Sequence, residues 1–484
     1  MRKKERKHAK NWFTHRLNTV YQIIFFGCAS IFIMSCQNNK LIDSPSLPDG
    51  ASYIAETPQR VGDVNKGLNY LVNGDYLSSG IPYDIFKLVY TDSSNFLGRT
   101  GDAASVGFNW NVVTSSNGIK VVATNCLSCH ATGLMGKTII GLGNTSDDNT
   151  VSRANTLNTL DAGVAIKYGK TSKEWEAYYP FSRGFSSIAP YILTSTQGIN
   201  PADKIFGSLS VFRDPTDLIW ASDGKPSFSI PVEEIPTDVP AWWLLKKKHA
   251  LYYNGLGVGD FGRLSMASAL VTMKDSAEAR KIDNKFSDVM AYIKSIQAPL
   301  YPFTIDKTLA DAGKVIYINT CSKCHGTYDA GNVTYPNLLI DQKSVNTDAA
   351  LANVYSEYPQ YHTWYNNSWF AKGANSAQLL PTKGYVAPPL DGIWATAPYL
   401  HNGSVPTLYD LFHGSERPKY WERTFDNSDY DEVKVGWKYT SKTSKESTKT
   451  YDTTLKGYTN VGHYYSSILT EAEKKQLIEY LKTL

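Results

Sequence analysis

Two strings in the chain combine cysteine and histidine at a spacing that supports covalent chemistry. Both have the form CxxCH, and they are Cys126-Leu-Ser-Cys129-His130 and Cys321-Ser-Lys-Cys324-His325. In the attachment of c-type haem, the two thiols of this motif add to the haem vinyl groups, and the histidine becomes the proximal iron ligand. Zinc would require a second ligand pair nearby, and a thiol redox pair would require a βαβ context. The sequence therefore predicts two covalently bound haem c groups.

The N-terminus predicts export. Residues 1–35 contain seven Lys and Arg residues, and residues 23–34 form an apolar run too short for an ordinary membrane span. The run leads through Ile-Met-Ser to Cys36, a pattern that resembles the lipobox of bacterial lipoproteins. That resemblance implies cleavage before Cys36 and its acylation, which would anchor the protein to a membrane. The alternative is an uncleaved signal anchor. We expect an exported, outer-membrane or periplasm-facing lipoprotein of a Gram-negative bacterium.

The charge balance argues against a nucleic acid partner. The 484-residue chain carries a formal charge of +4, but residues 1–35 hold seven basic residues and one acidic residue. The remainder has 42 basic and 44 acidic residues, and its net charge is therefore −2. Aromatic residues make up 13% of the chain, including 32 Tyr and 11 Trp. This composition suits a loop-rich protein wrapped around flat apolar cofactors.

Composition and periodicity predict four segments. A signal peptide (1–35) precedes a polar, Pro- and Ser-rich flexible tether (36–60). An N-terminal haem c domain (61–298) ends with a helix over 276–296, and a C-terminal cytochrome c domain (299–484) follows a Pro-containing break. The expected fold class is mainly α. Two class I cytochrome c-like haem domains pack together, with long loops and a few short strands.

The C-terminal segment has the sequence features of a class I cytochrome c. Gly313 and Tyr317 lie one turn apart on a predicted helix that leads into the second CxxCH. In class I cytochromes, such a pair marks the close crossing of the first and last helices, which a glycine permits. The last helix is predicted from Thr470 as N-cap, from Glu473 three residues later and from the apolar stripe that follows.

Histidine is the predicted sixth ligand of the C-terminal haem iron. Class I cytochromes usually supply a methionine from the loop before the last helix, but no methionine follows Met290. That loop contains His463, so we predict bis-histidine ligation with His325; His413 and His401 are the alternatives. Two imidazole ligands would lower the haem potential relative to His/Met ligation and leave no open position for chemistry.

The N-terminal haem has no recognisable distal ligand. A strand-like run leads into Cys126, and more strand and turn follow His130. The candidate ligands are Met135, His249, Met266 and Met273. None of them stands in a typical ligand loop. An open sixth position, which oxygen or peroxide chemistry requires, is therefore the leading hypothesis.

A longer motif links the chain to a known family. Residues 388–408 include Ala-Pro-Tyr-Leu-His401-Asn-Gly-Ser-Val-Pro, which resembles the motif of the bacterial dihaem cytochrome c peroxidase and MauG superfamily. The resemblance is closest to the rubber oxygenase branch. That branch also has an Arg-Pro pair, a Val-Gly-aromatic element and a Gly-His-aromatic element, here at Arg417, Val435 and Gly462.

The resemblance implies roles for further residues. The motif around His401 would lie between the haem domains and support hydrogen bonding near the C-terminal haem; a tight turn is the alternative. Trp242 or Trp243 matches a tryptophan that lies between the two haems, where an indole can relay electrons. The alternative for that pair is ordinary core packing. Phe261 is a candidate for the phenylalanine that borders the oxygen-binding iron.

These observations predict an exported dihaem c-type oxidoreductase. Peroxide or dioxygen would react at the N-terminal haem, as in a cytochrome c peroxidase or a rubber-oxygenase-like dioxygenase. The C-terminal bis-histidine haem would relay or store electrons. An organic substrate, an electron-donor cytochrome or cupredoxin, and a calcium ion are further candidate partners or cofactors. The alternative function is pure electron transfer, with both irons six-coordinate.

Overall fold

Two hydrophobic cores stabilise the structure, and each contains segments from both halves of the sequence. The computed structural model describes residues 47–90, 94–329 and 331–484, and Asp49–Leu484 form one unit. The first core joins residues 71–293 with residues 351–385. The second core joins residues 317–481 with side chains from 134–142 and 241–244. The predicted domain boundary at 298/299 falls in the linker between two helices. Both cores contain residues from either side of this boundary, so the division into two haem domains stays a prediction.

Helices supply most of the framework of both cores. Those before residue 298 are α2 (Val64–Asn73), α3 (Tyr83–Val89), α4 (Leu127–His130), α5 (Ala154–Tyr168), α6 (Lys173–Ile188), α7 (Ala202–Ser210), α8 (Phe261–Ser265) and α9 (Ser276–Ser295). Those after it are α10 (Lys307–Thr320), α11 (Ser322–His325), α12 (Gln342–Val345), α13 (Ala350–Glu357), α14 (Gln360–Asn367), α15 (Leu408–Phe412) and α16 (Glu471–Leu481). The helix predicted over 276–296 is confirmed as α9, which Asp275 caps with two backbone hydrogen bonds.

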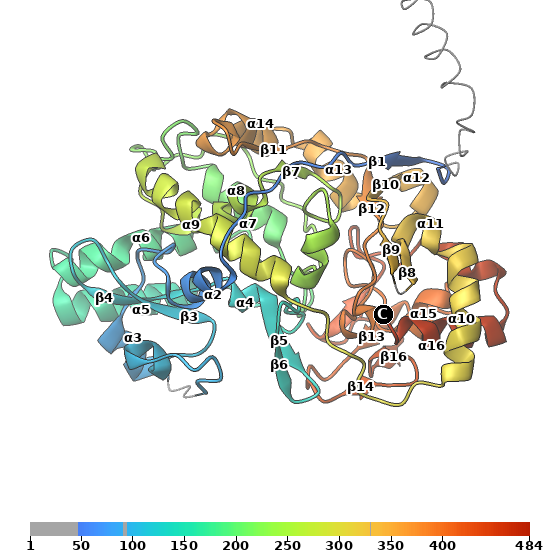
Figure 1. Ribbon diagram of the computed structural model, residues 1–484. Coiled ribbons are helices and arrows are strands. Elements are labelled where there is room, and N and C mark those ends of the chain that lie inside the picture. Colours follow the sequence, from blue (N-terminus) through green and yellow to red (C-terminus); the bar gives the residue numbers. More distant parts are fainter. Residues whose placement is uncertain (1–46, 91–93, 330) are drawn as a thin grey trace, which may run out of the picture. The chain divides into compact units, whose positions relative to one another are not determined.

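The strands are short and form small antiparallel sheets. The first group is β1 (Ala51–Tyr53), β2 (Ile81–Pro82), β3 (Trp110–Thr114), β4 (Lys120–Thr124), β5 (Ala131–Leu134), β6 (Lys137–Ile140) and β7 (Gly257–Gly259). The second group is β8 (Thr327–Asp329), β9 (Asn332–Thr334), β10 (Leu338–Asp341), β11 (Ala377–Leu379), β12 (Gly384–Val386), β13 (Tyr420–Glu422), β14 (Tyr430–Asp431), β15 (Gly436–Trp437), β16 (Thr440–Lys442) and β17 (Thr450–Asp452). Strand β11 pairs with β7 and contacts α8, and α14 packs against β11 and α7 (Figure 1). This pairing explains why residues 351–385 complete the first core.

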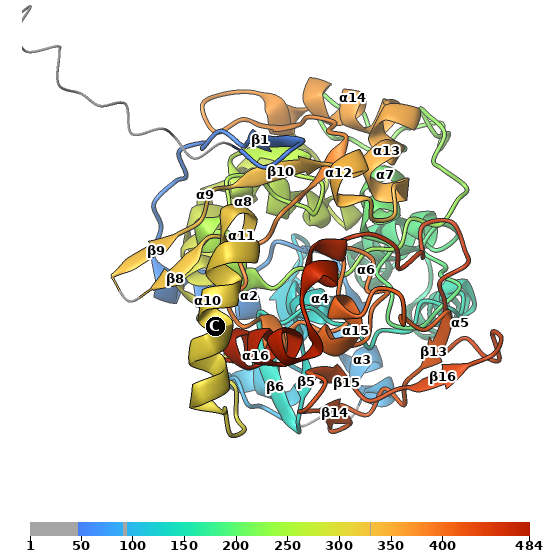
Figure 2. The same ribbon diagram turned by 90° about the vertical axis from the view of Figure 1, so that its right-hand side faces the viewer.

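Helices α10 and α16 cross (Figure 2), and both contribute side chains to the second core. A Cβ atom on Gly313 would lie 1.9 Å from the carbonyl oxygen of Gln476, so only glycine permits this approach. The rings of Tyr317 and Tyr480 meet beside the crossing with their centroids 5.1 Å apart. Thr470 and Glu473 form the predicted capping box at the start of α16. The sequence-based prediction of this helix pair is confirmed.

The predicted tether joins the body earlier than expected. Strand β1 pairs with β10, and further along Arg60 bonds to Asp260 at 2.7 Å and to Asp283 at 2.7 Å. Both carboxylates are largely buried, so these ion pairs bind residues 49–60 to the body. The predicted tether segment 36–60 therefore contains an ordered strap from Asp49 onward.

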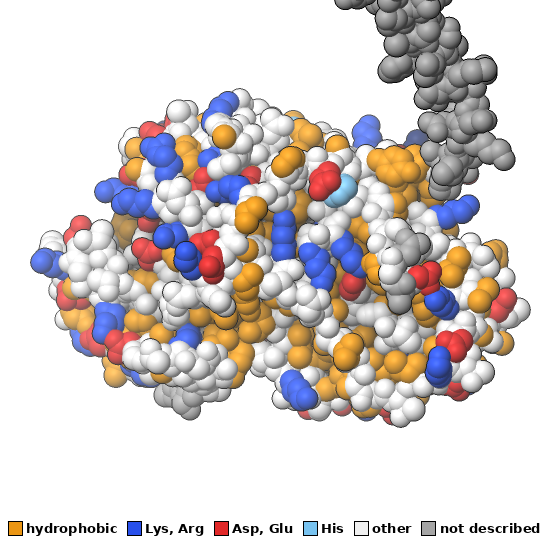
Figure 3. Space-filling view, in the orientation of Figure 1, with side chains coloured by type: hydrophobic (Ala, Val, Ile, Leu, Met, Phe, Trp, Pro, Cys, Tyr) orange, Lys and Arg blue, Asp and Glu red, His pale blue; other side chains and the backbone are white. Residues whose placement is uncertain are grey.

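The predicted signal peptide and Cys36 lie outside the described residues. Within the ranges that the structure covers, no helix is long and apolar enough to cross a membrane. Figure 3 shows one face of the molecule, on which Lys and Arg side chains are interspersed with Asp and Glu. A mixed distribution of this kind produces no extended field of one sign on that face.

Candidate haem sites

The first CxxCH motif forms the short helix α4, which local hydrogen bonds hold in place. The Asn125 side chain accepts a hydrogen bond from the Leu127 N–H at 2.9 Å and donates to Asn111 at 2.8 Å. At the other end of the motif, the Cys129 carbonyl accepts a hydrogen bond from the Asn144 N–H at 2.8 Å. The helix orients Cys126, Cys129 and His130 as one rigid group.

Trp242 stacks on the imidazole ring of His130. The ring centroids are 4.5 Å apart, and the ring planes differ by 20°. Gly141 sets this contact, because its N–H donates to the His130 carbonyl and its carbonyl accepts from the Trp242 N–H, each at 2.8 Å. Gly141 has φ +89° and lies against Trp242, which favours glycine at this position. Several glycines follow the first CxxCH motif and indicate turns there, but the sequence does not single out Gly141 among them.

The second CxxCH motif forms helix α11, and its histidine has a backbone partner. The Nδ1–H of His325 donates to the Pro388 carbonyl at 2.7 Å. This bond fixes the tautomer and leaves Nε2 for a metal. Pro388 is the first residue of the motif noted in the sequence, so that motif supports the proximal histidine directly.

His463 lies opposite His325, as the sequence predicts for a distal ligand. The two ring centroids are 6.1 Å apart. Two metal–imidazole bonds of about 2 Å each, together with the offsets of the nitrogens from their ring centres, come to about 6 Å. The separation therefore fits one iron between the two rings. The Nδ1 atom of His463 is buried without a hydrogen-bond partner in the described part of the chain.

The backbone around His463 is in an unusual conformation. His463 has φ +55°, in the left-handed region that non-glycine residues seldom adopt. Gly462 has φ +82°, and a Cβ atom there would lie 2.3 Å from the backbone of Asn346. Arg417 donates to the Gly462 carbonyl at 2.9 Å and to the Leu411 carbonyl at 2.8 Å. The Arg-Pro pair found by resemblance thus holds the loop that presents His463, a role that the sequence did not reveal.

The two alternative distal ligands have other partners. His413 donates from Nδ1 to the Tyr409 carbonyl at 2.6 Å, and its Nε2 lies 2.7 Å from Glu471. Both nitrogens of His413 are thereby used. His401 is buried and stacks on Tyr385 with 4.1 Å between the centroids. Its carbonyl accepts a hydrogen bond from the Asp238 N–H at 2.8 Å, which joins the family-like motif to the segment before Trp242.

The candidate residues near the first haem motif are dispersed. Phe261 is buried in the first core, where its described contacts are with Gln59 and Lys294. The candidate distal ligands also have separate environments. Met266 and Met273 are buried in the first core, Met135 packs against the second core, and His249 Nδ1 donates to the Ile54 carbonyl. The part of the chain that the structure describes brings none of these into ring contact with His130.

Trp243 connects the first haem motif to the segment that supports the second. It is fully buried, and its indole N–H donates to the Asp391 carbonyl at 2.8 Å. Asp391 lies three residues after Pro388, the partner of His325. The 3₁₀ helix η2 (Trp242–Lys247) therefore contacts His130 through the Trp242 indole. Through the Trp243 indole it contacts the segment 388–391, which binds His325. Lys247 reinforces the junction through an ion pair with Asp391 at 2.8 Å.

The three histidines have the protonation state that iron ligation requires. Burial lowers the pKa of His130 to about 3 and also lowers that of His325. Burial, and then the nearby His325, lowers the pKa of His463 to about 3. Neutral imidazoles can coordinate a metal. These residues, with an unpartnered buried Nδ1 on His130 as on His463, fit the predicted haem groups.

The four cysteines of the two CxxCH motifs fit the assignment to haem. Cys126, Cys129, Cys321 and Cys324 form no disulfide. Their thiols are therefore available for thioether bonds to haem. In the described ranges, no group of three or more His, Cys, Asp or Glu side chains could hold a separate metal ion. The candidate calcium ion stays a prediction, because calcium can also bind backbone carbonyl oxygens.

Comparison with known families identifies a class of protein. Residues 384–422 match the family model described as RoxA-like, cytochrome c-like. The matched segment contains Pro388, Asp391 and the His401 motif, which surround the second haem site. The match supports a c-type cytochrome oxidoreductase related to the rubber oxygenases, with covalently bound haem c.

Two curated proteins from Sinorhizobium fredii (strain NBRC 101917 / NGR234) are similar to the chain. Uncharacterized protein y4iM is 26% identical over 292 residues, which cover 51% of this chain and 64% of the relative. Uncharacterized protein y4iJ is 30% identical over 241 residues, which cover 37% of this chain and 39% of the relative. The chain thus spans less than two thirds of the length of either relative.

Proposed function

We propose that the protein is an exported dihaem oxidoreductase that reacts with peroxide or dioxygen at the haem held by His130. The haem held by His325 and His463 relays or stores electrons. The single observation that carries this proposal is the difference between the two histidine environments. His325 has a second imidazole at the distance of an iron ligand pair, whereas the described ring partner of His130 is Trp242, stacked on its face.

The two sites divide the chemistry between them. A haem bound at the first motif would supply an iron for reaction with peroxide or dioxygen, and His130 would be its protein ligand. Trp242 fixes the orientation of the His130 imidazole ring through the stacking contact. At the other site, His325 and His463 would both bind the iron, and a haem held in this way would supply electron transfer.

The segment from Trp242 to Asp391 supports electron transfer between the sites. Trp242 contacts His130, and Trp243 donates a hydrogen bond to Asp391, three residues from the Pro388 carbonyl that binds His325. All of these contacts belong to buried or half-buried groups in van der Waals or hydrogen-bond range. An electron can therefore pass between the sites through protein without crossing solvent.

The optical spectrum of the oxidised protein tests this division. We expect one low-spin haem and one haem with a high-spin component that shifts on addition of cyanide. The reduced protein should be reoxidised by peroxide or by dioxygen, and comparing the two oxidants identifies the one used. Two wholly low-spin haems that ignore cyanide, peroxide and dioxygen would contradict the proposal and support pure electron transfer.

The cellular context and substrates form part of the same proposal. The N-terminal segment favours a lipoprotein that is periplasmic or faces the periplasm. Such a protein would meet an electron-donor cytochrome or cupredoxin there if peroxide is the oxidant. An organic substrate replaces the donor if dioxygen is the oxidant, as the likeness to the rubber oxygenases suggests.

A further inference from the structure

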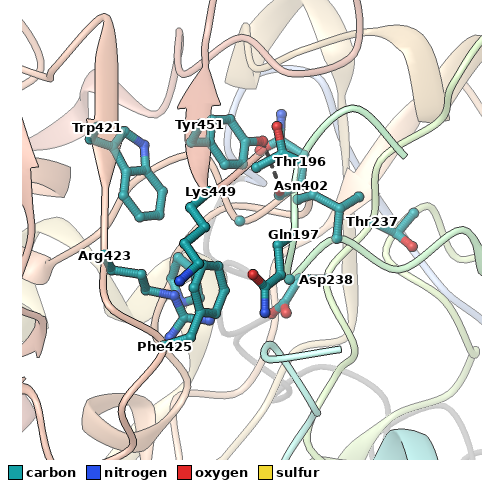
Figure 4. A pocket seen from close by; sticks show the side chains of 14 residues that line it. Thr196, Gln197, Thr237, Asp238, Asn402, Trp421, Arg423, Phe425, Lys449 and Tyr451 are labelled. Carbon is teal, nitrogen blue, oxygen red and sulfur yellow. Dashed lines mark hydrogen bonds between the residues drawn. The ribbon is translucent and has the colours of Figure 1, made fainter. Parts of the chain in front are cut away.

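A narrow pocket lies where four separate parts of the chain meet. Its walls come from residues 196–199, residues 237–238, the family-like motif at 398–403 and the strands around residues 421–451. Figure 4 shows Gln197, Asp238, Asn402, Arg423 and Lys449 around this space. This combination of polar side chains is not explained by the contacts of the haem-binding residues given above. The contacts of the Trp242–Asp391 segment do not explain it either.

Arg423 is the central charged group of the pocket. The residue is 5% exposed, and its guanidinium lies 4.3 Å from the ring of Phe425 and 4.5 Å from the ring of Trp437. One edge is satisfied, because Nη2 donates to the Thr145 carbonyl and to Thr145 Oγ1. The other terminal nitrogen, Nη1, is buried and has no hydrogen-bond partner in the described part of the chain.

In the described part of the chain, the hydrogen bonds of Arg423 go to Thr145, and no carboxylate forms a direct ion pair with its guanidinium. Burial lowers the pKa of Arg423 to about 9. The carboxylate of Asp238, which lines the same pocket, acts in the opposite direction and raises this pKa. Burial also raises the pKa of Asp238 to about 7, which weakens the opposing negative charge that this carboxyl can provide. A buried guanidinium with a free N–H and only a weak opposing charge favours an anion.

We propose that this pocket binds a carboxylate group through Arg423 Nη1, with Lys449 at its mouth. The cavity volume is about 10 Å³, which has room for one carboxylate oxygen, so the rest of the acid would lie at the mouth beside Lys449. A guanidinium presents N–H donors in the geometry that carboxylates accept. The carboxylate comes either from a free short-chain acid or from a haem propionate. Thr145, the partner of Arg423, follows Asn144, which binds the Cys129 carbonyl. The site is therefore connected to the first haem motif by two hydrogen bonds.

Binding of acetate to the full holoprotein tests the free-acid source. Acetate should raise Tm saturably at constant ionic strength, and Arg423→Gln should weaken this effect at least tenfold. Lys449→Gln, at the exposed mouth, should weaken acetate binding several-fold without affecting the fold. This second variant keeps the test decisive if Arg423→Gln does not fold. Arg280→Gln, which removes an exposed charge from α9, is the control and should bind acetate as the wild type does.

The haem-propionate source predicts a different result. Acetate should then have no saturable effect, because the site is already filled by the cofactor. The propionate bending band in the resonance Raman spectrum should shift in Arg423→Gln or Lys449→Gln but not in Arg280→Gln. The proposal is overturned if acetate binds equally well to wild type, Arg423→Gln and Lys449→Gln. It is also overturned if acetate does not bind and the propionate band is unchanged in both pocket variants.

Discussion

At the scale of single residues, hydrogen bonding separates histidines that look alike in the sequence. His463 and His413 both precede the last helix, and either could have been the distal ligand. His413 uses both ring nitrogens within the protein, one on a carbonyl and one on Glu471. His463 instead faces His325 from a left-handed backbone position. A residue is seldom held in that conformation without a structural or functional reason.

Replacing His463 tests its assignment. In His463→Ala the C-terminal iron should lose its sixth ligand, so most of its low-spin signal should become high-spin and its potential should rise. Optical and electron paramagnetic resonance spectra with potentiometry measure both changes. The first haem should keep its cyanide response, because His130 is untouched.

His413→Ala serves as the matched control. This change removes hydrogen bonds to Tyr409 and Glu471 and should reduce stability by about 1–2 kcal/mol. It should leave both haem spectra unchanged. A new high-spin signal in His413→Ala, with none in His463→Ala, would transfer the ligand role to His413.

At the scale of elements, close helix contacts depend on the absence of a single side chain. Gly313 permits the α10–α16 crossing, and Gly67 permits the contact of α2 with α9, where a Cβ atom would lie 1.9 Å from the Asp288 carbonyl oxygen. These contacts are between backbones, which cannot move aside as a flexible side chain can. The position of α10 matters for function because α11, with His325, follows it directly.

A pair of glycine substitutions tests this interpretation. Gly313→Ala should destabilise the protein by about 1–3 kcal/mol, because the new methyl group forces the two helices apart. Gly163→Ala, in α5, meets nothing within 4 Å. This control should gain about 0.5–1 kcal/mol, because alanine favours a helix more than glycine does. Thermal or denaturant unfolding measures both, and equal effects would contradict a specific role for the crossing.

Local features of these elements were predictable from the sequence, and distant contacts were not. The capping box at Thr470 and the spacing of Gly313 and Tyr317 depend on residues within one or two helical turns. The stacking of Trp242 on His130 joins residues more than a hundred positions apart, and it depends on Gly141 between them. Likewise, only the fold could reveal that both nitrogens of His413 are used or that Arg417 holds the His463 loop.

At the scale of the whole molecule, the strap at residues 49–60 contacts both halves of the body. Strand β1 pairs with β10 of the second half, and Arg60 bonds to Asp260 and Asp283 of the first half. The sequence predicted a tether here because the segment is polar and rich in Pro and Ser. Its order comes from partners about two hundred to three hundred residues away, which composition does not reveal.

Substitution of Arg60 tests the strap. Arg60→Gln should lower the free energy of unfolding by about 1–3 kcal/mol, because two largely buried carboxylates lose a charged partner. The effect is limited by Arg263, which still pairs with Asp283 at 2.9 Å. Limited proteolysis should then cut within residues 49–60 while the haem spectra stay unchanged. If unfolding and proteolysis match the wild type, the strap does not contribute to stability.

The strap at residues 49–60 limits the length of chain that could connect the body to a membrane. If Cys36 carries the lipid, only the 12 residues 37–48 separate the acylated residue from Asp49. Fully extended, these span at most about 45 Å. This connecting segment would have been about twice as long if the chain contacted the body only after residue 60. A lipid on Cys36 would therefore keep the start of the strap within about 45 Å of the bilayer surface.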